Sequence, residues 1–143
     1  MKKILKSFVL LLLVTVTAIS FAGCGKVSPV GEYRFKYMVT DGNIVSVNDK
    51  ILMDKDKEIA ITINFIILNV KKDGTFTVKA SKYLMGGNND ALYNGVWSQD
   101  YEDETKIVWS LNLHGEEEKG VAKLINGEII TSFYEETVFS FAK

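Results

Sequence analysis

The chain has 143 residues, 17 basic and 18 acidic side chains, one histidine, one cysteine and a formal net charge of −1. This length accommodates one hydrophobic core and is too short for two domains once a leader is set aside. The acidic side chains slightly outnumber the basic ones, which does not favour binding to nucleic acid, and one histidine with one cysteine cannot build a structural zinc site.

The first 21 residues have the layout of a secretory signal peptide. Lys2, Lys3 and Lys6 supply positive charge without an acid, and residues 8–21 carry no charge and are rich in Leu and Val. Positive residues stay in the cytoplasm, so this arrangement predicts export of the chain that follows. The apolar run is short for a permanent span, because crossing the hydrocarbon core takes about 20 apolar residues. We therefore expect the segment to be removed.

The apolar run ends at Phe21-Ala22-Gly23-Cys24, where two small residues precede the only cysteine. This tetrapeptide resembles the lipobox of bacterial lipoprotein precursors, with Phe21 in the place that the family usually gives to leucine. The resemblance implies cleavage between Gly23 and Cys24 and a thioether-linked diacylglycerol on Cys24. The alternative is an ordinary signal peptide cut nearby, which leaves Cys24 a free thiol. Lipidation accounts for the single unpaired cysteine in an exported protein.

This interpretation divides the chain into a signal peptide over residues 1–23, a lipidated N-terminus and tether over 24–30, and one domain over 31–143. Without the three leader lysines, 14 basic residues face 18 acidic ones, a net charge of −4. Anionic head groups repel that charge, so we expect acylated Cys24 to hold the protein at the lipid bilayer. The protein is then lipid-anchored at the cell membrane, facing outside the cytoplasm, and nucleic acid is not an expected partner.

The mature domain begins with a period-two alternation. Tyr33, Phe35, Tyr37 and Val39 share one apolar face, and polar residues separate the first three of them. This alternation predicts a strand with one buried and one solvated face. A second, short strand is possible over residues 44–47.

The next segments give mixed signals. Residues 49–57 either form one short helix, which Asp49 caps, or a loop. Residues 59–70 are the longest β-rich run and carry apolar residues on both faces, so we expect a strand that bulges or is covered on both sides near its end. Asp73-Gly74 closes a hairpin, because glycine adopts positive φ without a steric cost.

Five further strands are expected in the rest of the chain. They cover residues 92–98, 106–113, 120–125, 128–133 and 137–142. Asn126-Gly127 gives the strongest turn signal, because a two-residue turn with both φ angles positive favours that dipeptide. The turn should place Leu124 opposite Ile129 across the hairpin.

About eight strands, joined by short loops and without a crossover helix, predict an all-β antiparallel up-and-down meander. Such a sheet removes its exposed edges by curling into a barrel. Five short motifs are spread over the mature domain: Gly31-Glu32-Tyr33, Asp73-Gly74-Thr75-Phe76, Gly95-Val96-Trp97, Asn126-Gly127-Glu128 and Phe139-Ser140-Phe141-Ala142-Lys143. Through these motifs the chain resembles the lipocalin-like domains of Gram-positive lipoproteins, which implies a lipocalin-like barrel.

The chain departs from the lipocalin pattern at two points. The opening Gly-x-Trp of that family appears here as Gly31-Glu32-Tyr33. In lipocalins a basic residue from the last strand covers the aromatic ring, and the only arginine of this chain is Arg34, at the other end of the domain. Lys143 is therefore the candidate to cover Tyr33.

Catalytic motifs do not stand out in the sequence. His114, beside Gly115, is interpreted as an exposed turn residue, and the sequence contains no Gly-x-Ser-x-Gly, phosphate-binding glycine loop or His-Glu-x-x-His. The acidic residues of 100–104 can be a Ca²⁺ site or, more commonly, solvated charge. A second acidic run, 116–118, should lie at the opposite end of the barrel. We expect no enzymatic activity, no metal and no cofactor.

The aromatic residues leave two functions open. A barrel of about eight strands can enclose one small ligand, and Tyr37 and Trp109 are the candidates to line a cavity for a small apolar or amphipathic molecule. Alternatively, the aromatic side chains fill the barrel. The protein is then a solid-core interaction module that contacts an envelope protein through exposed loops, with Tyr101 and residues 116–118 as candidate contacts.

Overall fold

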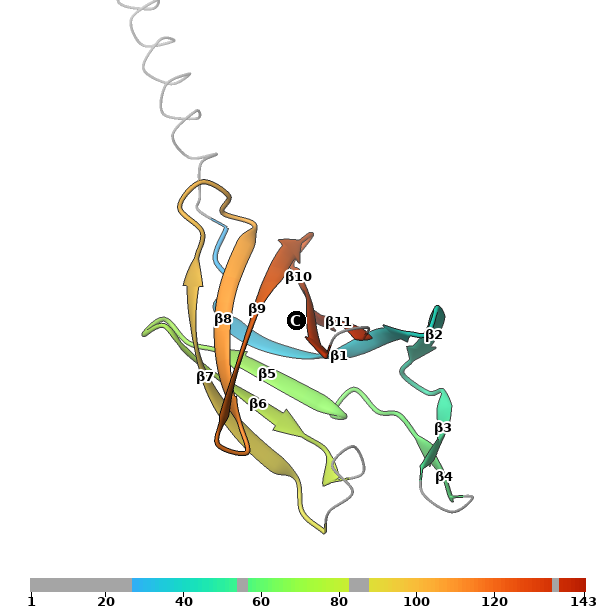
Figure 1. Ribbon diagram of the computed structural model, residues 1–143. Coiled ribbons are helices and arrows are strands. Elements are labelled where there is room, and N and C mark those ends of the chain that lie inside the picture. The colour runs from blue at the N-terminus through green and yellow to red at the C-terminus, as the bar shows by residue number, and fades with distance from the viewer. Residues whose placement is uncertain (1–26, 54–56, 83–87, 135–136) are drawn as a thin grey trace, which may run out of the picture.

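The computed structural model describes residues 27–53, 57–82, 88–134 and 137–143 (Figure 1). The strands are, in chain order, β1 (Gly31–Thr40), β2 (Asn43–Ser46), β3 (Lys50–Met53), β4 (Lys57–Ala60), β5 (Ile66–Val70), β6 (Thr75–Ala80), β7 (Ala91–Gln99), β8 (Lys106–Leu113), β9 (Glu116–Ile125), β10 (Glu128–Tyr134) and β11 (Thr137–Ala142). All their pairings are antiparallel.

Eight of these strands form a closed barrel. The strands from β5 to β11 each pair with the next one along the chain, β5 also pairs with β1, and β1 pairs with β11 to close the ring. The predicted all-β, lipocalin-like barrel is therefore confirmed. β2 extends the sheet beside the second half of β1, and the β3–β4 hairpin stands outside the ring (Figure 1).

The short helix predicted near residues 49–57 is wrong, because Lys50–Met53 and Lys57–Ala60 pair as the antiparallel strands β3 and β4, while residues 54–56 lie outside the described residues. Asp49 does not cap a helix. Its carboxylate accepts a hydrogen bond from the Ser46 amide at 2.7 Å, and its carbonyl accepts one from the Ile61 amide at 2.9 Å. Asp49 thus uses its carboxylate and its carbonyl in turns at the base of the hairpin, which is a common role for aspartate outside helix caps.

The continuous strand predicted over residues 59–70 is interrupted. β4 ends at Ala60 and β5 begins at Ile66, and between them the Phe65 amide donates to the Thr62 carbonyl at 3.0 Å. Ile61 and Phe65 flank this turn and are both buried. The apolar residues on both faces of the run thus belong to two different elements, the outer hairpin and the barrel wall.

A β-bulge in β1 overturns the prediction that Tyr33, Phe35 and Tyr37 share one face. Phe35 lies opposite Phe141, whereas Tyr37 lies opposite Ser140, so the pairing register shifts by one residue at Lys36. A one-residue shift moves the following side chains to the other face of a strand. Tyr33 and Phe35 are accordingly buried in the core, and Met38 rather than Tyr37 packs against it.

The predicted hairpin turns are confirmed. Asn126 and Gly127 have φ angles of 52° and 79°, and Leu124 lies opposite Ile129. Gly74 has a φ angle of 83° in the turn between β5 and β6. These positive angles are the conformations that asparagine and glycine adopt most readily, so the local sequence determines the register of both hairpins.

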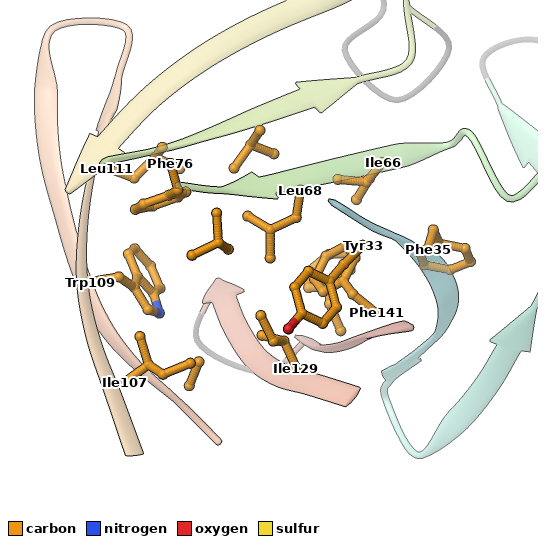
Figure 2. Close-up of a cluster of buried hydrophobic side chains, with 14 of the residues drawn as sticks. Tyr33, Phe35, Ile66, Leu68, Phe76, Ile107, Trp109, Leu111, Ile129 and Phe141 are labelled. Carbon is orange, nitrogen blue, oxygen red and sulfur yellow. The ribbon is translucent and has the colours of Figure 1, made fainter. Parts of the chain in front are cut away.

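Aromatic rings and aliphatic side chains fill the barrel interior (Figure 2). Two glycines make room for two of these rings. Gly95 lies directly opposite Phe76, and Gly120 directly opposite Trp109, and a Cβ atom at either glycine would overlap the facing ring. Each ring thus occupies the space that the glycine opposite it leaves free, and this allows dense packing of the interior.

Lys143 covers the ring of Tyr33, as the lipocalin resemblance predicts. Its Nζ lies 5.3 Å from the centre of the Tyr33 ring, within the range of a cation–π interaction, and its alkyl chain packs on Gly31. Tyr33 is fully buried, and its hydroxyl has no hydrogen-bond partner among the described residues. Burial raises the pKa of this hydroxyl, because a phenolate cannot be solvated there.

Candidate functional site

Trp109 lies in the barrel interior (Figure 2). Its indole nitrogen donates a hydrogen bond to Oγ1 of Thr131 at 2.9 Å. It lines a cavity in the barrel interior, partly open to solvent and about 30 Å³ in volume, together with Trp97, Phe76, Ile107 and Ile129; we call it the internal cavity. Small-molecule sites typically measure about 300–1,000 Å³. The internal cavity has room for about one water molecule and is too small for such a ligand.

Tyr37 lies elsewhere, in a solvent-open groove that we call the outer groove. This groove has a volume of about 510 Å³, and it runs beside β1, the end of β2 and the last residues of the chain. Its lining includes Arg34, Lys36, Tyr37, Val47, Ile63 and Lys143. The structure therefore does not bring Tyr37 and Trp109 together in one cavity.

The bulge at Lys36 explains why Tyr37 reaches the outer groove. With a regular strand, Tyr37 would follow Tyr33 and Phe35 into the core, but the register shift turns it outward. Val47, which follows β2, is held to β1 by a hydrogen bond from its amide to the Lys36 carbonyl at 3.4 Å. Ile63 comes from the interrupted segment between β4 and β5.

Three cationic side chains line the outer groove. The Arg34 guanidinium pairs with Glu32 at 2.6 Å and donates to the side chain of Asn64. Lys36 pairs with Glu128, and this ammonium group lowers the pKa of the Glu128 carboxyl, with Ser140 donating a further hydrogen bond. Lys143 forms no ion pair with an acidic side chain of the described residues, and its ammonium group lies over the Tyr33 ring.

The remaining polar residues singled out in the sequence lie apart from this groove. His114 is an exposed turn residue, as predicted, with a φ angle of 53° and its ring edge-on to Tyr93 at 5.6 Å. The two acidic runs lie at opposite ends of β8, as expected. Within the described residues, no three His, Cys, Asp or Glu side chains are grouped to hold a metal ion.

The carboxylates of the loop between β7 and β8 have individual partners. Asp100 pairs with Lys106 at 3.0 Å, and Asp103 pairs with Lys123 at 2.5 Å. Lys123, together with hydrogen bonds from the side chain and backbone of Thr105, lowers the pKa of Asp103 from 3.8 to about 2. These bonds stabilise the charged form of each carboxylate.

Replacing Lys123 by glutamine should raise the pKa of Asp103 from about 2 towards 3.8, without reaching it, because the Thr105 bonds remain. The pKa of Asp103 is lower in the folded protein than in the unfolded chain. The ionised Asp103 therefore stabilises the fold at pH values above 3.8, and this stabilisation is lost as the pH falls through about 2. Carboxyl-carbon NMR titration measures the shift. Lys119→Gln is the control, because Lys119 pairs with Glu117 instead, and an equal shift in both variants would contradict the assigned partner.

Gly23 and Cys24 lie outside the described residues, so the lipobox interpretation stays a prediction. In the part of the chain that the structure covers, no helix has the length and apolar character to cross a membrane. Compared with known proteins, the chain matches no family model, no curated protein and no solved structure.

Proposed function

We propose that this protein is an extracytoplasmic lipoprotein, held at the membrane by acylated Cys24, whose barrel binds a small amphipathic molecule in the outer groove. The lipobox-like Phe21-Ala22-Gly23-Cys24 supports the anchor. One observation carries the location of the ligand. The outer groove measures about 510 Å³ and falls within the usual range of ligand sites, whereas the internal cavity measures about 30 Å³.

The side chains of the outer groove favour a molecule with an anionic head and an apolar tail. Lys143 offers a positive charge with no acidic partner among the described residues, and charge-assisted contacts are the strongest hydrogen bonds to phosphate or carboxylate. Val47, Ile63 and the ring of Tyr37 offer apolar contact area. The barrel itself then serves as a rigid support for the groove.

Titration of residues 25–143, which contain every described strand, with decyl phosphate below its micelle concentration tests this proposal. Binding should be saturable by calorimetry, and Tyr37→Ala should weaken it about tenfold, because the ring's apolar contact with the tail is lost. Trp97 and Trp109 line the internal cavity and not the groove, so their fluorescence should stay unchanged.

Tyr101→Ala is the matched control, because Tyr101 is fully exposed and lies outside the groove. Quenching of the tryptophans would place the ligand in the interior instead. An absence of saturable binding would favour the second candidate, a solid-core module that contacts an envelope protein. That candidate is supported by the filled interior and by the complete exposure of Tyr101.

A further inference from the structure

The segment before β1 is fastened to one end of the barrel. The side-chain amide of Gln99, at the end of β7, donates to the Val27 carbonyl at 2.7 Å. The same amide group also donates to the Glu104 carbonyl in the loop between β7 and β8. Pro29 is fully buried. The chain therefore enters the barrel along the β7–β8 end, and it is already held there at Val27 (Figure 1).

This attachment shortens the tether. Between Cys24 and Val27 the chain advances three residues, which span at most about 11 Å when fully extended. If the whole segment from Cys24 to Gly31 were loose, its seven residues would span about 25 Å. With Cys24 acylated at the membrane, the point of attachment at Gln99 lies within about 11 Å of the bilayer surface.

The loop at this end presents a side chain suited to the interface. Tyr101 is 100% exposed, and tyrosine is enriched at membrane–water interfaces, where its ring contacts apolar groups and its hydroxyl stays hydrated. Asp100 and Asp103 of the loop are neutralised by Lys106 and Lys123, whereas Glu102 and Glu104 of the same loop are exposed. This pairing reduces the repulsion between the loop and the negative head groups of lipids.

We infer that the β7–β8 end of the barrel faces the lipid bilayer, with Tyr101 in the head-group region and the turn between β8 and β9 pointing away. This orientation rests on the proposed anchor at Cys24. It follows from the Gln99–Val27 hydrogen bond, the short remaining tether and the exposed aromatic ring at the same end.

Quenching by brominated lipids tests the orientation. The full chain is expressed in a bacterium that acylates lipoproteins, its mass is measured, and it is reconstituted into phosphatidylcholine vesicles with bromine near the head group. Tyr101→Trp reports the β7–β8 end, and Glu116→Trp reports the opposite end, about 25 Å away along β8. After subtraction of the unsubstituted protein, quenching should be about threefold greater for Tyr101→Trp, because only that position lies at the interface.

Gln99→Ala releases Val27 and should bring the two quenching values closer together, whereas Ser98→Ala, on the exposed face of β7, should not. Equal quenching of Tyr101→Trp and Glu116→Trp in acylated protein would overturn the orientation and leave the proposed lipoprotein function intact. A measured mass without acyl chains would overturn both. Greater quenching at Tyr101→Trp with an acylated mass supports both.

Discussion

Replacing Phe141 by alanine should lower the free energy of unfolding by about 3–5 kcal/mol, the usual cost of removing a buried phenylalanine ring. Phe141 is fully buried and lies opposite both Phe35 of β1 and Ile129 of β10. It therefore fills the core at the seam where the barrel closes (Figure 2). Urea unfolding of residues 25–143, followed by tryptophan fluorescence, measures the loss.

Val138→Ala is the matched control on the same strand. Val138 is 38% exposed and lies opposite Val39 on the outer side of the seam, so its truncation should cost less than about 1 kcal/mol. A similar loss of stability in both variants would show that strand propensity, rather than core packing, holds β11 in place. A negligible loss for Phe141→Ala would contradict the closed barrel.

The substitution Gly120→Ala adds a single methyl group and should lower the free energy of unfolding by about 2–3 kcal/mol. Alanine normally suits a strand better than glycine, but the new Cβ would overlap the indole ring of Trp109. The ring would have to move, and it would lose its hydrogen bond to Thr131. Near-ultraviolet circular dichroism reports the ring's environment, and urea unfolding reports the stability.

A second substitution separates overlap from a general effect on β9. Lys119→Ala changes the neighbouring exposed residue, which forms only a surface ion pair with Glu117 at 3.1 Å, and such pairs contribute about 0–1 kcal/mol. In the double variant Gly120→Ala with Trp109→Leu, the smaller side chain should accommodate the methyl group. If Gly120→Ala were equally costly in that background, the overlap would not be its cause.

Local signals were sufficient for most of the barrel. Asn126 and Gly127 readily adopt the positive φ angles of a two-residue turn, and this turn fixes the pairing of β9 with β10. The alternation over β8, with Trp109 and Leu111 inward, also follows directly from the residues. Lys143 could be assigned to the ring of Tyr33 because the lipocalin resemblance supplied the pairing, and the cation–π contact confirms it.

Tertiary contacts decided the parts that the sequence did not predict. No residue type around Lys36 signals a bulge, so the alternation predicts Tyr37 on the core face, whereas the structure places it on the outer face. Asp49 suits a helix cap and a turn equally well, and only its bonds to Ser46 and Ile61 distinguish them. The outer groove combines residues from segments that are distant in the sequence, so no local pattern predicts it.

The seam between β1 and β11 also bears on how fast and in what order the barrel assembles. Arg34 pairs with Ala142, so closure joins the two ends of the domain sequence, whereas each pairing from β5 to β11 joins neighbouring strands. Contacts between distant residues carry a large loop-closure entropy and slow folding. We therefore expect the hairpins to form early and ring closure, which requires the final strand, to limit the folding rate.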